Sequence, residues 1–209
     1  TYEAWLAVLK VNLLTPFFLT QTMQDTLKKS SCPAIVNVSS IYGLIAPDRN
    51  LYEGTEMTNP AVYAASKGGL IQLTKWLSSY LCPEIRVNSV SPGGIERGQN
   101  ELFKERYEKK TLLGKMAIEE DISGVIEFLL SSDSSYMTGQ NLIVDAGYTV
   151  TWMNLKKEET LKAYDAIAED YAKYSQGKFN YLDAIEKLVL KFSLKKGSIL
   201  DIGSGDGRR

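Results

Sequence analysis

Long helical patterns alternate with short apolar runs through the first 147 residues, and this alternation limits the possible folds more than any other feature. Apolar side chains that recur every three or four residues predict helices, and brief runs rich in Val and Ile predict buried strands. Such alternation favours an α/β fold, a parallel sheet with helices on both faces. The first helix carries its apolar residues along one side, so it is predicted to lie in the core. The predicted order is helix 3–27, strand 34–38, helix 61–81, strand 86–90, helices 100–110 and 119–131, and strand 142–144.

Composition and charge favour small-molecule chemistry in a folded protein. Hydrophobic residues make up 44% of the 209 residues, enough to form a core. The formal net charge is -1 and no long basic run is present, so the sequence lacks the character of a nucleic-acid or anionic-membrane binder. Histidine is absent, which excludes histidine triads, histidine metal ligands and imidazole acid–base catalysis from these residues. No metal site is predicted.

The cysteine content and the apolar runs bear on the cellular setting. Cys32 and Cys82 are too few to hold the fold together by disulfides, so a reducing cytoplasm is expected. Uninterrupted apolar runs stay well short of the roughly 20 residues that cross a bilayer, and the first residues lack the basic region of a signal peptide. We therefore expect a cytoplasmic protein without a membrane partner.

Tyr63 and Lys67 form the most informative local pattern. They stand four residues apart at the start of a predicted helix, a step that places the phenol and the ammonium on one helical face. A nearby ammonium favours tyrosinate and lowers the tyrosine pKa from about 10, which makes the phenol a usable general acid or base. The spacing alone is weak evidence, because Tyr174 and Lys178 repeat it. Only the first pair lies between two predicted strands.

Five further motifs surround this pair in the order typical of one protein family. They are Asn12 in the first helix, Ser39-Ser40 after the first strand, Arg86-Val87-Asn88, Ser91-Pro92-Gly93-Gly94, and the stretch 136–147. Together they resemble the motifs of short-chain dehydrogenases/reductases over residues 1 to about 148. The resemblance implies part of a doubly wound, Rossmann-like parallel sheet. It also implies an NAD(P)-dependent oxidoreductase that interconverts an alcohol and a ketone.

The resemblance assigns catalytic roles to four residues. Ser40 would hydrogen-bond the substrate oxygen, and Tyr63 would exchange its proton with that oxygen. Lys67 would lower the pKa of Tyr63 and hold the nicotinamide ribose. Asn12 would order a water molecule in a proton relay.

The resemblance also implies a cofactor site and an assembly. Pro92, Gly93 and Ile95 would lie against the nicotinamide of NAD or NADP. Members of the family usually form dimers or tetramers through the helix over 61–81 and the last strand, so a homo-oligomer is expected.

Some of these motifs also have a purely structural interpretation. Asn12 could bond a neighbouring backbone group, and Ser40 could cap a loop. The turn Pro92-Gly93-Gly94 could simply end a strand. Asn37 and Asn88 are predicted to be structural and to bridge strands through their side-chain amides.

The sequence departs from the family pattern at its start. Complete members begin with a strand and a glycine-rich turn that holds the cofactor pyrophosphate, and the first segment shows neither. The chain has no initiator Met and begins within a helical pattern. We therefore expect a fragment that folds poorly and is inactive, because strands of the sheet would present unpaired edges.

A second departure is the long interval between Ser40 and Tyr63. The added residues, 48–58, are expected to lie beside the substrate. They resemble the corresponding part of dehydrogenases associated with flagellin modification and bacterial surface-sugar biosynthesis, which implies a sugar or nucleotide-sugar substrate. The alternative is a loop with no bearing on specificity.

The sequence changes in character after Gly147. A strand pattern over 199–202 runs into a glycine-rich turn of the kind that lets a backbone approach an adenosyl cofactor. This turn and the helix around 164–171 resemble the first motif and the lid helix of class I methyltransferases. The resemblance places three glycines beside the methionine moiety of S-adenosylmethionine and an aspartate near its amino group. These residues are Gly203, Gly205, Gly207 and Asp201. A dinucleotide-binding turn is the alternative.

The predicted organisation is a fusion of two incomplete domains. Residues 1–149 form the catalytic half of a dehydrogenase, 150–158 a linker, and 159–209 the first helices and strand of a second Rossmann-like domain. A methyltransferase with a non-catalytic, dehydrogenase-like assembly segment is one alternative, and a sugar-binding or scaffold protein is another. An error in sequence assembly that joined two neighbouring genes would produce the same amino-acid sequence.

Overall fold

The computed structural model describes residues 1–151. The chain divides into two units, Thr1–Met153 and Asn154–Arg209. The predicted linker 150–158 lies outside the described residues except for residues 150 and 151, which belong to α6 (Tyr148–Thr151). The predicted methyltransferase segment 159–209 lies wholly outside them, with the pair Tyr174 and Lys178. So do the predicted S-adenosylmethionine residues Asp201, Gly203, Gly205 and Gly207.

A Rossmann-like parallel sheet of three strands forms the centre of the first unit. β1 (Ala34–Val38) pairs with β2 (Arg86–Pro92), and β2 pairs with β3 (Asn141–Val144). The predicted parallel sheet is confirmed, with β2 and β3 slightly longer than predicted. Residues 87–92 of β2 are all buried, because this strand is paired along both edges and covered on both faces. The outer edge of β1 has no partner strand among residues 1–151.

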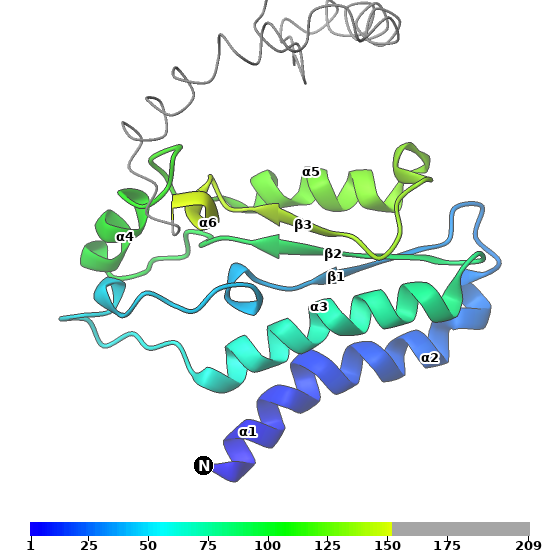
Figure 1. Cartoon of the computed structure of the whole chain (residues 1–209), viewed down its shortest axis with the longest axis horizontal. Helices are drawn as coiled ribbons and strands as arrows, with labels where there is room; N and C mark the ends of the chain where they lie inside the picture. The colour runs from blue at the N-terminus through cyan, green and yellow to red at the C-terminus, as the bar shows by residue number, and fades with distance from the viewer. Residues whose placement is uncertain (152–209) are drawn as a thin grey trace, which may run out of the picture. The chain divides into compact units, whose positions relative to one another are not determined.

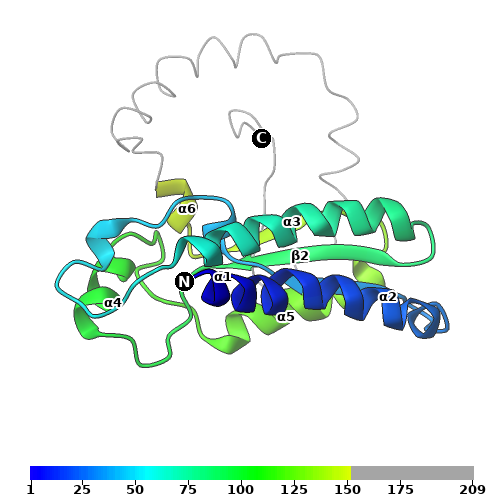
Figure 2. The same ribbon diagram turned by 90° about the horizontal axis from the view of Figure 1, so that it is seen from below.

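Helices cover both faces of this sheet, as the alternation predicted (Figure 1). α3 contacts β2 on one face, and α5 contacts β1 and β2 on the other. α1 and the turn that follows it contact α3, and α1 and α2 run alongside α3 (Figure 2). The helices are α1 (Tyr2–Leu9), α2 (Thr15–Leu27), α3 (Ala61–Leu81), α4 (Glu101–Glu108), α5 (Glu119–Leu130) and α6 (Tyr148–Thr151). A π-helical turn, η1 (Lys10–Leu14), joins α1 to α2, and 3-10 turns occupy η2 (Ile41–Gly43), η3 (Arg49–Leu51) and η4 (Ser132–Ser134).

Each face of the sheet has its own apolar cluster. Between the sheet and α3, Val87 and Ile85 pack against Leu77 and Leu81. On the opposite face, Val90 packs against Ile122 and Leu129 of α5. A third cluster lies beyond the carboxyl ends of the strands and consists of Ile41, Leu51, Phe103, Tyr107, Met116 and Tyr148. This third cluster supports the candidate site.

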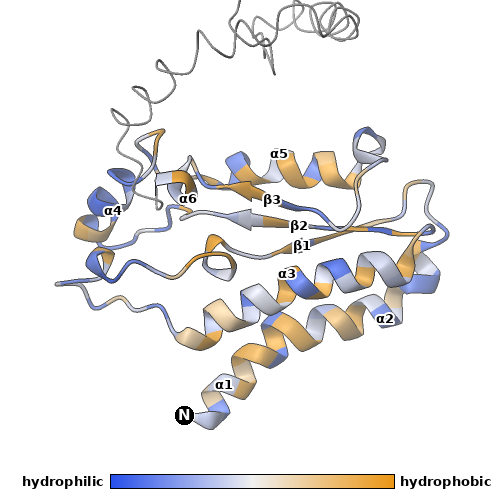
Figure 3. Cartoon of the chain, in the orientation of Figure 1, coloured by the Kyte–Doolittle hydropathy of each residue, from blue (hydrophilic) through white to orange (hydrophobic). Residues whose placement is uncertain are grey.

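The first helix differs from its prediction in packing and in regularity. A π-helical turn interrupts it, with Thr15 N–H bonded to the Lys10 carbonyl five residues back. The prediction of a core helix is wrong for the described structure, because α1 has no buried residue and Thr20 is the one buried residue of α2. Figure 3 shows apolar residues along both helices, and Trp5 and Phe18 are 45% and 56% exposed. One side of this stretch contacts α3, and several of its other apolar side chains remain largely exposed.

The helical stretch Tyr2–Leu27 has the length and composition of a membrane span, with a mean hydropathy of 1.2 in its most apolar window. It is the one such stretch within residues 1–151. Counting only uninterrupted apolar residues misses it, because single polar residues are spaced along it. The observation is weak evidence for a membrane, since buried core helices and signal sequences have the same composition.

The stretch after β1 is more regular than the predicted extended loop. It contains η2 and η3, and its residues Ile41 and Leu51 are buried, at 2% and 0% exposure. Burial of two aliphatic side chains fixes this segment against the third apolar cluster.

Candidate active site

The predicted site residues gather at one edge of the sheet. Ser40 follows β1 by two residues and Pro92 ends β2, and parallel strands bring such carboxyl ends to the same edge. Tyr63 and Lys67 lie in the first turns of α3, which packs on β2 and on η2. In doubly wound folds this edge is where ligands bind.

Lys67 lies beside Tyr63 and is held by the end of β1. Its Nζ is 5.7 Å from the centre of the Tyr63 ring and donates a hydrogen bond to the Val38 carbonyl at 2.8 Å. Burial lowers the pKa of the Lys67 ammonium. An ammonium has three N–H groups, so two remain for other acceptors once Val38 is bonded.

Ser40 caps the short turn that follows β1. Its Oγ accepts the Tyr42 N–H at 3.2 Å, and the residue is 7% exposed. The structural interpretation of Ser40 as a cap therefore describes a real contact. The cap uses a lone pair only, and the hydroxyl proton has no acceptor among the described residues, so it remains able to bind a substrate oxygen.

Asn12 lies in the π-helical turn η1 and is connected to Tyr63 through Ser66. Its Nδ2 donates to Ser66 Oγ at 3.0 Å, and Ser66 Oγ donates to the Tyr63 carbonyl at 2.7 Å. The partner of Asn12 is thus a side chain, not the neighbouring backbone of the structural interpretation. π-helical turns recur at functional sites. Ser66 was not predicted as a site residue. Its position three residues after Tyr63 is visible in the sequence, but its complete burial is visible only in the structure.

The glycines after β2 are required by close packing, not only by the end of the strand. A Cβ on Gly93 would lie 2.8 Å from Tyr107 Oη and 2.9 Å from Asp145 Cα. Gly94 N–H donates to Tyr107 Oη at 2.6 Å. The tyrosine of α4 therefore holds this turn in place, a role that the sequence did not predict.

The residues expected on the nicotinamide side form one continuous strip. Pro92 is buried, while Gly93 and Ile95 are partly exposed, and Ile95 pairs with Ala117 in an isolated parallel bridge. Lys67 belongs to the same edge of the sheet and keeps two N–H groups for other acceptors, so this edge has both apolar surface and hydrogen-bond donors. These features fit the ring and ribose of a nicotinamide nucleotide.

The two asparagines predicted to be structural have different partners. Asn88 bonds the Met137 carbonyl at 2.9 Å and the Gln140 N–H at 3.0 Å, so it bridges β2 to the segment before β3, as predicted. Asn37 instead donates to Thr74 Oγ1 of α3 at 2.9 Å. Its predicted strand-to-strand bridge is wrong, because the Asn37 side chain points to the helix that covers β1.

A group of four tyrosines supports the site and was not predicted. Tyr42 and Tyr52 have their hydroxyl oxygens 2.9 Å apart, and the rings of Tyr107 and Tyr148 stack at 4.8 Å. Burial raises the pKa of Tyr107 to about 12 and raises the pKa values of Tyr42 and Tyr148 well above 10. All three are therefore neutral phenols at neutral pH. They come from separate segments, so no sequence period could reveal them.

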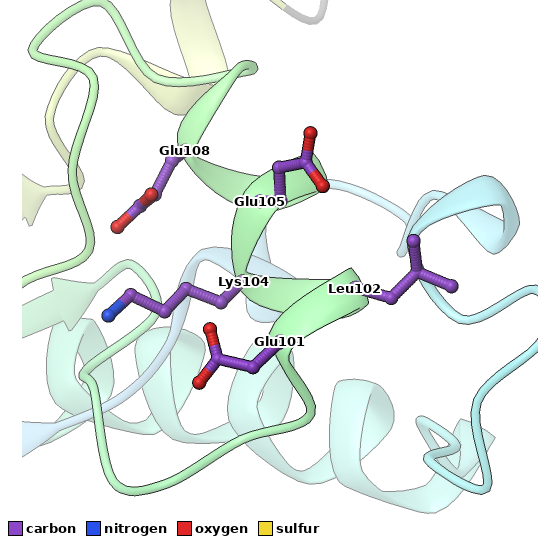
Figure 4. Close-up of a pocket in the computed structure, with 5 residues that line it drawn as sticks. All are labelled: Glu101, Leu102, Lys104, Glu105 and Glu108. Carbon is purple, nitrogen blue, oxygen red and sulfur yellow. The ribbon is translucent and has the colours of Figure 1, made fainter.

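A surface hollow on α4 contains none of the predicted residues. Its lining side chains extend in different directions from the helix (Figure 4). Lys104 is ion-paired with Glu96, and Glu105 is paired with Lys109. The hollow is a solvated charged surface and has no converging chemical groups. It is lined by Glu101, Leu102, Lys104, Glu105 and Glu108.

The fold and this site define an α/β protein with a tyrosine–lysine pair at the carboxyl edge of its parallel sheet. Over its first 149 residues the chain matches the family model described as enoyl-(acyl carrier protein) reductase. The chain belongs, in this region, to the short-chain dehydrogenase/reductase family.

Curated relatives agree with this assignment. The chain is 38% identical over 149 residues to post-translational flagellin modification protein A of Campylobacter coli. It is 39% identical over 153 residues to the 3-oxoacyl-[acyl-carrier-protein] reductase FabG of Thermotoga maritima. Each match covers 71% of this chain and 58% of the relative, so the chain spans little more than half the length of these proteins.

Solved structures show the same fold. A short-chain dehydrogenase from Leptospira borgpetersenii with bound NAD+ matches with a TM-score of 0.66 and 42% identity, over 71% of this chain and 57% of that one. A 4-hydroxyisoleucine dehydrogenase complexed with NADH and succinate matches with a TM-score of 0.62 and 32% identity, over 72% of this chain and 60% of that one.

Proposed function

We propose that these residues are the catalytic part of an NAD(P)-dependent oxidoreductase that interconverts an alcohol and a ketone. The observation that carries the proposal is the placement of Lys67 beside Tyr63, at the sheet edge where Ser40 retains a free hydroxyl proton. Relatives whose names describe carbonyl reduction or alcohol oxidation, FabG and cyclopentanol dehydrogenase, support it.

The proposed chemistry assigns one task to each side chain. Ser40 donates a hydrogen bond to the substrate oxygen and orients it, and keeps its own proton. Tyr63 gives its phenolic proton to that oxygen during reduction and takes it back during oxidation. The Lys67 ammonium stabilises the phenolate that Tyr63 then becomes. A bound nicotinamide would supply or accept the hydride.

The surrounding residues position these groups. Lys67, Pro92, Gly93 and Ile95 would hold the nicotinamide and its ribose. Asn12, which we place in the proton relay, also fixes the first turns of α3 through its bond to Ser66.

We further propose a sugar or nucleotide-sugar substrate. The flagellin-modification relative and the added segment 48–58 support this class. The relative FabG argues against a sugar substrate, because its name describes a 3-oxoacyl group on acyl carrier protein as the substrate. The panel of substrates in the test therefore includes both classes.

The assembly and the setting are also proposals. A homo-oligomer is supported by the exposed apolar side chains of α1, α2 and α3, among them Trp76 and Tyr80 at 51% and 66% exposure. A reducing cytoplasm is supported by the two free cysteines, Cys32 and Cys82.

A fused S-adenosylmethionine-dependent methyltransferase is the proposal for residues 159–209. It depends on the glycine-rich turn at 203–207, on Asp201 before it and on the resemblance of the helix around 164–171 to a lid helix. Calorimetric binding of S-adenosylmethionine to the full-length protein that contains this chain tests it, and a Gly205→Val variant is the matched control. Equal binding by the variant would refute this assignment of the turn.

The oxidoreductase proposal is tested by nicotinamide turnover. The full-length protein is assayed for oxidation of NADH and NADPH with nucleotide-activated keto-sugars and with a 3-oxoacyl thioester. We expect Tyr63→Phe to lower kcat/KM by a factor of about 10³, the usual contribution of a general acid. Tyr136→Phe, which changes a fully exposed tyrosine, is the control. Equal turnover by Tyr63→Phe and the control would rule out this mechanism.

A further inference from the structure

The added segment 48–58 is anchored to the α4 region by two cationic side chains. Arg106 Nη1 donates to the carbonyl of Asn50 at 3.0 Å and also to the carbonyl of Glu53. Lys110, two residues after α4, is ion-paired with Asp48, whose side chain is only 15% exposed. Both cations are therefore engaged by the segment itself, and the segment has a defined position against α4.

This anchoring places Tyr52 between α4 and the turn η2 that follows β1. Leu51 is fully buried next to it, and the Tyr52 ring lies 5.3 Å from the ring of Phe103 in α4. The Tyr52 hydroxyl then meets the Tyr42 hydroxyl at 2.9 Å. A residue from the added segment is thus paired with a residue from the turn that follows β1.

Tyr42 connects this pair to Ser40. The two residues share the short turn η2, and the Tyr42 N–H donates to Ser40 Oγ. The phenol pair is consequently attached through η2 to Ser40, whose hydroxyl would bind the reacting oxygen.

The phenols retain hydrogen-bonding capacity. In the Tyr42–Tyr52 pair one hydroxyl donates and the other accepts, which leaves one proton and several lone pairs unused. Tyr148, in the same cluster, is 1% exposed, and its hydroxyl lies near that of Tyr42 without a well-formed hydrogen bond to it or to another described residue. Buried hydroxyls are normally bonded, so a small adjustment of Tyr42 or a bound ligand would complete this one.

The apolar cluster around the phenols contributes aliphatic, aromatic and Met side chains. The charged side chain beside Tyr107 is acidic: it is Asp145, whose carboxylate accepts the N–H groups of Gly147 and Thr149. Arg106 and Lys110, the cations of the anchor, are already paired with Asn50, Glu53 and Asp48. A carboxylate or phosphate placed against the phenols would meet no counter-charge from this cluster, whereas a neutral hydroxyl could both donate and accept.

We propose that Tyr42 and Tyr52, with Tyr148 behind them, are specificity-determining residues that bind a hydroxyl group of an uncharged, hydroxylated ring. The ring hydroxyl neighbours the reacting carbon. This inference rests on the proposed oxidoreductase function for the identity of the reacting carbon, but not for the binding of the second hydroxyl.

The test compares two cyclic alcohols that differ by one hydroxyl, cyclopentanol and cis-1,2-cyclopentanediol. Binding to the full-length protein is measured by saturation-transfer NMR, and turnover is measured with NAD+ and NADP+. We expect the unmodified protein to prefer the diol, and Tyr52→Phe to reduce that preference about tenfold, the effect of one lost hydrogen bond in a site built to make it. Tyr42→Phe should reduce the preference similarly. Tyr136→Phe is the control for the substitution itself.

The outcomes separate the two proposals. A diol preference that falls in Tyr42→Phe and Tyr52→Phe but not in Tyr136→Phe supports the assignment. An unchanged preference in both site variants, or no preference in the unmodified protein, overturns it. Selective binding of the diol without any nicotinamide turnover would leave the hydroxyl site standing and refute the oxidoreductase function for these alcohols. Circular dichroism spectra of each variant establish that it is folded.

Discussion

Polar side chains are extensively hydrogen-bonded at one end of the sheet and incompletely hydrogen-bonded at the other. At the amino end of β2, the Arg86 guanidinium donates to the carbonyls of Leu129, Ser131 and Ser134 at 3.0 to 3.1 Å. At the carboxyl end, the Ser40 proton and the Tyr148 hydroxyl have no partner among residues 1–151. Polar groups are buried or partly buried at both ends, so burial does not explain the difference.

The groups at one end of the sheet hold the fold together, whereas those at the other end remain available to bind a ligand. Arg86 joins β2 to the end of α5 and to η4, and its bonds leave little capacity for a ligand. The groups at the carboxyl end are positioned by neighbours but retain free protons and lone pairs. A satisfied polar network stiffens a fold, whereas unsatisfied groups in a site are available for a substrate.

The largest effect is expected for Ser40→Ala in the full-length protein. Loss of the group that binds the reacting oxygen should lower kcat/KM by about 10² to 10³. The free energy of unfolding should fall by only about 1 kcal/mol, the usual value of a lost cap. Ser39→Ala is the matched control, because Ser39 Oγ donates to the Lys67 carbonyl and so serves structure. Similar kinetic losses in both variants would remove the distinction between the two serines.

Arg86→Met should show the opposite pattern. We expect a loss of about 3 kcal/mol in the free energy of unfolding, because several buried carbonyl groups lose their donor at once. The activity of each folded molecule should change little. Urea denaturation measures the loss, with Arg97→Met as the control. Arg97 pairs with Glu119 at an exposed site, so that change should cost less than about 1 kcal/mol. A loss for Arg86→Met as small as the control's would contradict the structural role.

Tyr148→Phe should be neutral or stabilising by about 1 kcal/mol. The variant removes a buried hydroxyl without a partner, and an unpaired hydroxyl carries a desolvation cost of about 1–3 kcal/mol. Tyr107→Phe, in the ring stacked on Tyr148, should destabilise because Gly94 N–H loses its acceptor. Thermal denaturation of the two variants compares them directly. A clear loss for Tyr148→Phe would mean that its hydroxyl is bonded in the folded protein.

The smallest effect concerns the charge of Lys67. Burial lowers its pKa in the folded protein below the ordinary 10.5. Between the lowered pKa and 10.5 the unfolded chain binds more protons, so stability rises with pH through that window. Urea denaturation at several values up to pH 10.5 should show a small upward slope relative to Lys67→Met, because Lys67 is only half-buried. A downward slope would reverse the sign of the shift.

Local patterns were sufficient for the element order of residues 1–151. The strands 34–38 and 86–90 and the helix 61–81 were predicted with bounds that agree closely, because side-chain periodicity depends only on neighbours in the sequence. The exposure of α1 and α2 was not predicted, since periodicity identifies an apolar side but not what covers it. The π-helical turn η1 has no such signal either.

The candidate site divides in the same way. Tyr63 and Lys67 are brought together by one helical turn, so their spacing was enough to predict their proximity. Ser40 and Pro92 were predicted from the resemblance to short-chain dehydrogenases, and the structure places both at the carboxyl edge of the parallel sheet. The contacts from Tyr107 to Gly94 and from Tyr52 to Tyr42 depend on how α4 and the added segment fold back onto the sheet, and no short-range pattern contains that information.

The sequence by itself determined the α/β architecture and the proximity of the tyrosine–lysine pair, because both depend on regular local geometry. The order of its motifs was enough to indicate the family of the first segment. Only the tertiary structure decided which polar groups are satisfied. Arg86 finds its acceptors at residues 129 to 134, and the hydroxyl of Tyr148 finds none among the described residues. Hydrogen-bond satisfaction is a property of long-range packing, and this property distinguishes the amino end of β2, where Arg86 is engaged by several carbonyls, from the carboxyl end, where we propose the active site.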